Sequence, residues 1–224
     1  MTGLDGIFLD FYGTLAGGDR AAVVSICRRV IADHGLAIGA DEMAIAWGRR
    51  YFAAIESVNG THFRNLTQIE EDTLVDTALD LGGSIEATGY IQMLNDYLAA
   101  PPLFEEVREV IAALKLPVCI VSNADQRELS KALSHHDLRF DYVVTSEKAR
   151  SYKPESRIFS LALALTGWSP ARVLHVGDSL HSDVAGARRM GIRTAWVNRS
   201  ERISDIGTEQ PDVTWHDLRP LALL

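Results

Sequence analysis

The sequence predicts an α/β fold: a doubly wound, mostly parallel sheet with a Rossmann-like core and an inserted α-helical cap domain. Short apolar runs without polar alternation recur along the chain, as expected for strands buried on both faces of a parallel sheet. Helical patterns separate the later runs, so strand and helix alternate. Residues 10–117 separate the first run from the second, far more than an ordinary crossover needs.

Five strands are expected, and a polar group follows each. The strands are predicted at 7–9, 118–121, 142–144, 173–176 and 194–197. They are followed by Asp10, by Ser122 and Asn123, by Thr145 and Ser146, by Gly177 and Asp178, and by Asn198. Ligands of open parallel sheets bind beyond the carboxyl ends of the strands, so these groups are expected to converge on one site.

The long interval after the first strand is predicted to form a helical domain. Val23, Cys27, Val30, Ile31 and His34 share one helical face, and further helices are expected at about 41–57, 66–81 and 87–98. Core helices are expected around 158–165 and 182–190. The predicted core is 1–16 with 99–224, and the predicted cap is 17–98. Gly17-Gly18 and 99–102 are the expected linkers. A cap over the strand ends would exclude water from the site.

The composition of the chain excludes some classes of binding partner. The 224-residue chain is 47% hydrophobic and 23% charged, which suits a folded globular protein. A formal net charge of -8 offers no footprint for a nucleic-acid backbone. No apolar run approaches a membrane span, and no basic segment precedes an apolar one at the N-terminus. We therefore expect a cytoplasmic monomer or homodimer that binds a small anionic substrate and neither nucleic acid nor membrane.

Four motifs stand in order along the chain. They are Asp10 with Gly13-Thr14-Leu15, then Ser122-Asn123, then Lys153-Pro154, and then Gly177-Asp178-Ser179-Leu180 with Asp183. Together they resemble the haloacid dehalogenase superfamily of hydrolases, in the subfamily whose helical cap is inserted after the first strand. The resemblance runs from residue 7 to about residue 198, and the order of the motifs makes it specific.

The resemblance implies a role for each matching residue. Asp10 matches the nucleophile, and a carboxylate attacks carbon or phosphorus when it is held in line. Thr14, Ser122 and Asn123 match groups that bind anionic oxygens of the substrate. Lys153 matches the point charge that neutralises the nucleophile and the developing anion, with Lys148 as the weaker candidate.

The fourth motif implies a metal. Asp178 matches a magnesium ligand, Asp10 another, and Tyr12 would contribute its backbone carbonyl. Mg²⁺ is a hard ion that takes oxygen ligands and would allow several nearby carboxylates to ionise. Asp183 would lie in or just behind this shell, or would cap the helix that follows it, or both.

Tyr12 stands where phosphatases of the superfamily carry their second Asp, the general acid and base. We favour a Mg²⁺-dependent phosphatase that forms an aspartyl-phosphate on Asp10, with Tyr12 in an altered acid–base position. Loss of acid–base assistance costs about 10²- to 10⁴-fold in rate, which is serious but tolerable. Arg49 is the expected cap residue for substrate binding.

The alternative is a 2-haloacid dehalogenase that uses Asp10 without a metal. Asp-x-Tyr-Gly-Thr is the form those enzymes carry, and their halide leaves unprotonated. Three features depart from them: the phosphatase-like fourth motif, Trp47 followed by Gly48 instead of Arg, and Phe159 where a Tyr is expected. A third possibility is a binding module that keeps the fold without the chemistry.

Overall fold

The computed structural model describes residues 3–200 and 209–224. The chain divides into two compact units. The α/β unit comprises the chain up to Gly17, Pro102–Asn123 and the chain from Arg139 onward, and the helical unit comprises Gly18–Pro101 and Ala124–Leu138. The boundaries fall at the expected linkers, whereas 124–138, which was expected in the core, packs with the helical unit.

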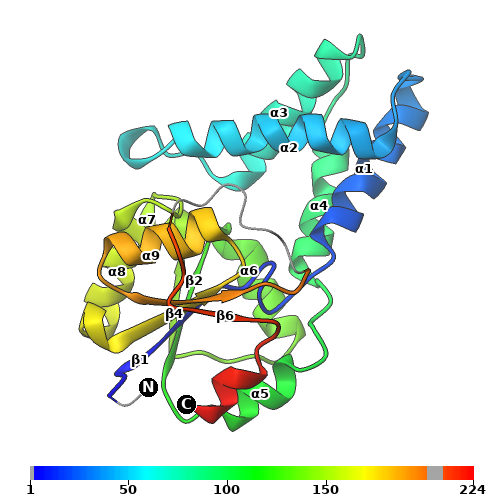
Figure 1. Cartoon of the computed structure of the whole chain (residues 1–224). Coiled ribbons are helices and arrows are strands. Elements are labelled where there is room, and N and C mark those ends of the chain that lie inside the picture. The colour runs from blue at the N-terminus through cyan, green and yellow to red at the C-terminus, as the bar shows by residue number, and fades with distance from the viewer. Residues whose placement is uncertain (1–2, 201–208) are drawn as a thin grey trace. The chain divides into compact units, whose positions relative to one another are not determined.

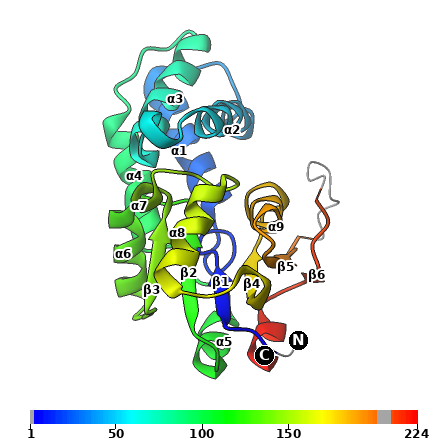
Figure 2. The ribbon, with the colours of Figure 1, turned by 90° about the vertical axis from the view of Figure 1, so that its left-hand side faces the viewer.

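A six-stranded parallel sheet forms the α/β unit. Its strands are β1 (Gly6–Leu9), β2 (Val118–Ser122), β3 (Tyr142–Thr145), β4 (Val173–Gly177), β5 (Arg193–Val197) and β6 (Val213–Trp215). Their order is β3-β2-β1-β4-β5-β6, as the labels run from left to right in Figure 2. All five predicted strands are present, and the doubly wound fold is confirmed. The edge strand β6 was not predicted, because only three residues form it.

Helices cover the sheet. The α/β unit contains α5 (Val107–Ala113), α7 (Ser146–Ala149), α8 (Ser156–Thr166), α9 (Gly186–Arg189), the 3₁₀ turns η2 (Pro170–Arg172) and η4 (Arg219–Leu223), and the π-helical turn η3 (Leu180–Ala185). Side chains of α7, α8 and α9 form one apolar core with Phe8 of β1, Cys119 of β2 and Val144 of β3. Figure 1 shows α8 and α9 over this face of the sheet. The strand ends are therefore held by a buried, rigid layer.

The helix expected at 182–190 differs from the prediction. The segment begins with the π-helical turn η3, and only α9 is α-helical. Ser179 caps η3, because its Oγ accepts a hydrogen bond from the Ser182 N–H at 3.0 Å. Asp183 lies inside the turn and does not act as the cap.

The helical unit contains α1 (Asp19–His34), α2 (Ala40–Ser57), η1 (Gly60–His62), α3 (Leu66–Asp80), α4 (Thr88–Ala99) and α6 (Gln126–His135). Its core packs Ile26, Cys27, Val30, Met43, Trp47, Leu74 and Ile91 together. Cys27 and Val30 lie on the predicted face of α1, whereas His34 is exposed and contacts Tyr90 Oη. No described helix is long and apolar enough to cross a membrane.

Asp125 ties α6 to α3 inside the helical unit. Its Oδ1 accepts from the Leu66 N–H at 2.8 Å, and its Oδ2 accepts from the Thr67 N–H at 2.9 Å. These are free donors at the start of α3, and a carboxylate is favoured at the positive end of a helix. The next residue, Gln126, begins α6. This explains why 124–138 belongs with the helices rather than with the sheet.

A buried acid in the helical unit predicts how stability depends on pH. Glu70 is 5% exposed, and its Oε2 has no hydrogen-bond partner among the described residues. Burial, with added repulsion from Asp125, Glu128 and Glu71, raises the pKa of Glu70 to about 8. The folded chain thus retains a proton that the unfolded chain loses near pH 4.5. Stability should therefore fall as pH rises between these two values.

Glu70→Gln should remove this dependence. Above pH 8 the variant should be more stable than the wild type by on the order of 3 kcal/mol, and near pH 4.5 the difference should vanish. Urea unfolding at pH 5 and pH 8.5 measures it. Glu86→Gln, at an exposed position in the same unit, controls for the change in net charge. Parallel stability curves for wild type and Glu70→Gln would contradict the prediction.

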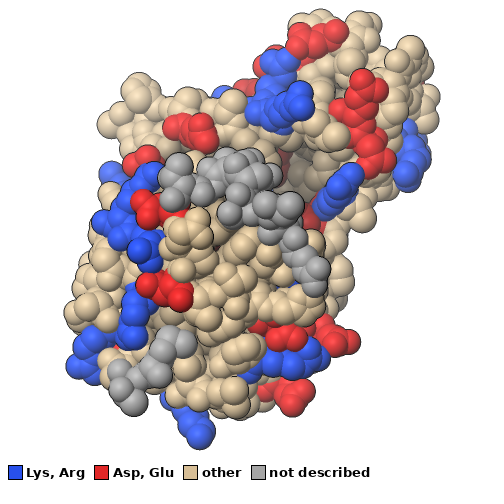
Figure 3. Space-filling model, viewed as in Figure 1, with Lys and Arg blue, Asp and Glu red and all other residues tan. Residues whose placement is uncertain are grey.

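Charges of both signs are interspersed on the molecular face drawn in Figure 3. Several basic side chains have acidic partners. Arg50 pairs with Asp80, Arg64 with Asp72, and Arg188 with both Glu209 and Asp212. The exclusion of nucleic acid and the expected assembly state remain predictions.

Candidate active site

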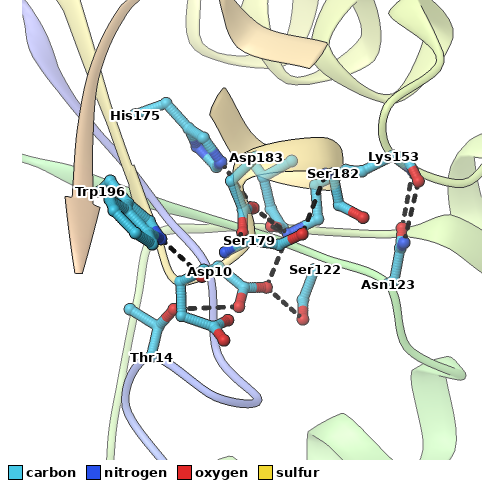
Figure 4. A network of polar contacts seen from close by, with 12 residues as sticks. Asp10, Thr14, Ser122, Asn123, Lys153, His175, Ser179, Ser182, Asp183 and Trp196 are labelled. Atoms are coloured by element: carbon cyan, nitrogen blue, oxygen red, sulfur yellow. Dashed lines mark hydrogen bonds and ion pairs between the residues drawn. The ribbon is translucent and has the colours of Figure 1, made fainter. Parts of the chain in front are cut away.

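Asp10 follows β1 and lies at the centre of a buried polar network (Figure 4). Its backbone N–H donates to the Val176 carbonyl at 3.0 Å, which extends the sheet by one residue. Its Oδ1 accepts from Lys153 Nζ at 2.7 Å and from Ser122 Oγ at 2.9 Å, and its Oδ2 accepts from Thr14 Oγ1 at 3.1 Å. The network therefore fixes both carboxylate oxygens.

The loop after Asp10 is a tight turn. The Gly13 N–H donates to the Ala16 carbonyl at 2.7 Å, and the Leu15 N–H donates to the Phe11 carbonyl at 2.8 Å. Gly13 has a φ of 89°, and a Cβ built there would lie 2.5 Å from Asp178 Oδ1. Only glycine permits this backbone and this approach of the carboxylate. The first motif thus needs Gly13 because the fourth motif packs against it.

Lys153 is buried and contacts three acceptors. Its Nζ donates to Asp10 Oδ1 at 2.7 Å, to Asp183 Oδ1 at 2.6 Å and to the Val121 carbonyl at 3.0 Å. Burial alone would lower the pKa of Lys153, but the two carboxylates raise it well above its ordinary value. The ammonium therefore stays charged. Lys148, the weaker candidate, is exposed.

Asn123 holds the backbone of Lys153. Its Oδ1 accepts from the Lys153 N–H at 2.7 Å, and its Nδ2 donates to the Lys153 carbonyl at 3.1 Å. The Asn123 side chain thus binds the chain itself, and a substrate contact through its backbone amide stays a prediction. Ser122 Oγ is directed at Asp10.

Asp183 links Lys153 to a histidine that the sequence analysis did not identify. His175 Nε2 lies 2.9 Å from Asp183 Oδ1, and the Ser179 N–H donates to Oδ2 at 3.0 Å. Burial would raise the pKa of Asp183, but Lys153 and His175 bring it far below its ordinary value. An ionised carboxylate only accepts, so His175 Nε2 carries the hydrogen. His175 lies within the buried strand β4, and its position in the sequence does not distinguish it from an ordinary interior residue.

Asp10 has the opposite pKa shift. Its burial raises the pKa; Lys153 lowers it, and the negative charge of Asp183 raises it again, leaving a net rise. Asp10, Asp178 and Asp183 each place a carboxylate oxygen within 4.8 Å of the others. The sequence analysis thus named three acids that the fold brings together from the ends of β1 and β4.

Two further predicted residues are Tyr12 and Arg49. The ring of Tyr12 packs edge-on against Phe11, with centroids 4.9 Å apart, and is partly exposed. Arg49 belongs to α2 of the helical unit, where it is exposed, whereas its neighbour Arg50 is paired with Asp80. The substrate-binding role of Arg49 stays a prediction.

Known proteins are similar to this chain in sequence. Residues 4–191 match the family profile of haloacid dehalogenase-like hydrolases. The chain is 29% identical over 233 aligned residues to an (S)-2-haloacid dehalogenase of Pseudomonas sp. strain YL, covering 100% of this chain and 95% of that relative. It is 34% identical over 130 residues to a phosphoserine phosphatase of Thermus thermophilus, covering 54% of this chain and 51% of the relative.

Solved structures agree on the fold. The L-2-haloacid dehalogenase of Xanthobacter autotrophicus superposes with a TM-score of 0.81 at 20% identity, covering 99% of this chain and 98% of the other. The family match covers all four motifs. Residues of these motifs also form the polar network around Asp10. The chain therefore belongs to the haloacid dehalogenase-like hydrolases.

Proposed function

We propose that the chain is a 2-haloacid dehalogenase that uses Asp10 as its nucleophile and requires no metal. The observation that carries this proposal is a carboxylate held on both oxygens by neutral or cationic donors, with Tyr12 two residues later instead of a second acid. A halide leaves as a stable anion and needs no proton, so the missing acid costs the reaction nothing. Similarity to dehalogenases over the full chain supports the same conclusion.

The proposed reaction has two steps. A carboxylate oxygen of Asp10 forms a bond to C2 of the substrate while the carbon–halogen bond breaks, and the halide leaves with the electron pair. Lys153 lowers the pKa of Asp10 against the larger rise caused by burial, and so favours the ionised form that attacks. Water then adds to the carbonyl carbon of the resulting ester and releases the 2-hydroxyacid, regenerating Asp10. Asp178, partly exposed and within 4.8 Å of Asp10, is the carboxylate proposed to accept the water proton.

A Mg²⁺-dependent phosphatase is the second candidate, favoured by the cluster of three carboxylates. Their oxygens are donors that Mg²⁺ prefers, so the residues present fit the ion. Asp10, Asp178 and the Tyr12 carbonyl would hold it, and it would neutralise the charge of a bound phosphate. Lys153 already neutralises the inner oxygens of Asp10 and Asp183. Similarity to a dehalogenase over 100% of the chain, against similarity to a phosphatase over 54% of it, favours the first candidate.

One panel of assays separates the candidates. We expect halide release from (S)-2-chloropropionate with inversion to (R)-lactate, unchanged by a chelator, and much slower release from the (R)-enantiomer. p-Nitrophenyl phosphate should not be hydrolysed. Phosphate release that requires Mg²⁺, without halide release, would replace the first candidate by the second. Absence of both activities would favour the binding module instead.

Solvent oxygen provides an independent readout. In a single turnover in H₂¹⁸O, water that adds to an alkyl ester places the label in the Asp10 carboxylate. Water that attacks an aspartyl-phosphate at phosphorus places it in inorganic phosphate. We expect a peptide containing Asp10 to gain 2 Da, as peptide mass spectrometry would detect.

A further inference from the structure

Two side chains near the end of β5 donate to backbone carbonyls in two different loops of the active site. Trp196 Nε1 donates to the Asp178 carbonyl at 2.9 Å, a bond drawn in Figure 4. Arg199 Nη2 donates to the Thr14 carbonyl at 2.8 Å. We call residues 10–17 the nucleophile loop and residues 177–183 the fourth-motif loop. One short segment of chain thus holds both.

Arg199 is itself fixed from two sides. Its Nη1 lies 2.7 Å from Glu106 Oε1, and its Cζ lies 3.7 Å from the centroid of the Phe104 ring. Glu106 is buried and also accepts from the Leu218 N–H at 3.2 Å. Burial would raise the pKa of Glu106, but these hydrogen bonds lower it, so the carboxylate remains an anion. The planar guanidinium is therefore locked between carboxylate and carbonyl.

Phe104 supports the far end of the nucleophile loop. Its N–H donates to the Leu15 carbonyl at 3.0 Å, and a Cβ built at Gly17 would lie 2.5 Å from Phe104 Cζ. Arg199 and the ring on which it stacks thus contact the loop at Thr14, Leu15 and Gly17. Loss of the Arg199 side chain would free the Thr14 carbonyl and remove the cation that stacks on Phe104.

The separation of the two loops matters for the chemistry. Asp178 packs against Gly13 with no room for a Cβ, and its carboxylate lies within 4.8 Å of that of Asp10. A displacement of about 1 Å between reacting groups can cost about 10²-fold in rate. Trp196 and Arg199 donate to backbone carbonyls of the two loops, so we expect their effect on rate to pass through the backbone.

We propose that Trp196 and Arg199 form a clamp that sets the spacing between the nucleophile loop and the fourth-motif loop, and so positions Asp10 and Asp178 for reaction. Both are positioning residues. The proposal rests on the proposed hydrolysis through Asp10, and it assigns a role to a segment outside the four motifs.

Arg199→Lys and Trp196→Phe test the clamp by conservative changes. Lysine keeps the charge but cannot bridge Glu106 and Thr14 with a planar fork, and phenylalanine keeps a ring but loses the N–H. With (S)-2-chloropropionate, kcat should fall about 10- to 100-fold in Arg199→Lys and about 10-fold in Trp196→Phe, with KM within about threefold. The double variant carries both changes. If its loss of kcat is smaller than the product of the two single losses, Trp196 and Arg199 act on the same spacing.

Arg172→Lys is the matched control. Arg172 also joins a carbonyl and a carboxylate, donating through Nε to the Gly3 carbonyl at 2.9 Å and pairing with Asp5 at 2.8 Å. It precedes β4, at the end of the strands opposite the site. Its replacement should lower the melting temperature by a few degrees, as Arg199→Lys does, and leave kcat unchanged. Equal kcat in Arg199→Lys and Arg172→Lys would overturn the proposal.

Hydrogen exchange followed by mass spectrometry tests the clamp without any substrate. Peptides covering 11–17 should exchange faster in Arg199→Lys, and peptides covering 177–184 should exchange faster in Trp196→Phe, with Arg172→Lys as in the wild type. Unchanged exchange in both variants would overturn the clamp. If wild type releases neither halide nor phosphate, the proposed function fails, and exchange still decides whether the clamp holds the loops.

Discussion

Asp10→Asn should lower turnover of (S)-2-chloropropionate by on the order of 10⁴- to 10⁶-fold, because the amide cannot form the ester intermediate. The fold should survive. Burial raises the pKa of Asp10, so its ionised form is costly inside the protein, and a neutral side chain of the same shape relieves that cost. Steady-state halide release and thermal unfolding measure the two effects.

The melting temperature of Asp10→Asn shows whether the variant still folds. Lys153 retains Asp183 as a partner at 2.6 Å, so no buried ammonium is left without a carboxylate. We expect a melting temperature no lower than that of the wild type. Residual turnover above about one hundredth of the wild-type rate would show that Asp10 is not the attacking group, since loss of a nucleophile is far more severe.

Lys153→Met should lower activity by about 10³-fold or more and the free energy of unfolding by about 3–5 kcal/mol near pH 7. The change leaves Asp10 and Asp183, each nearly fully buried, without their shared cation. Removing one partner of a buried ion pair is costly because the remaining charge stays in a poorly solvated site.

The pH dependence of Lys153→Met identifies this cause. Without the ammonium, the buried carboxylates bind protons more tightly in the folded than in the unfolded chain. Stability of the variant should therefore be lost as pH rises through 5 to 8 and regained as pH falls. Lys148→Met, at an exposed position, should leave both activity and stability near wild type. A stability difference independent of pH would point to packing instead.

The site residues that could be predicted from the sequence are those at the ends of the strands. Asp10, Ser122 and Asp178 each follow or close an apolar run that is recognisable by itself. Parallel strands place their carboxyl ends at one edge, so the convergence of these groups follows from the fold class alone. Asp183 was also identified as a site residue. The alternative prediction that it caps the following helix was wrong, because Ser179 caps the turn η3.

Other groups carry no local signal. His175 has the burial of any interior strand residue, and the motif does not show that the Asn123 side chain binds the backbone of Lys153 with both of its polar atoms. Asp125 reads as a turn residue after β2, although it contacts a helix that begins 59 positions earlier. These roles depend on contacts made in the folded chain, which no periodicity records.

The sequence by itself determined the doubly wound sheet, the inserted helices and the polar residues that follow the strands. These follow from the apolar pattern and from residue types at strand ends, which are local properties of the chain, whereas the role of Asp10 as nucleophile is implied by the family resemblance and stays a proposal. The tertiary structure alone decided which oxygens Lys153 neutralises, that His175 holds Asp183, and that Trp196 and Arg199 hold the two loops. His175 and Asp183 meet across the turn that follows β4, and the other contacts join segments far apart in the sequence. All of them exist only once the chain has folded.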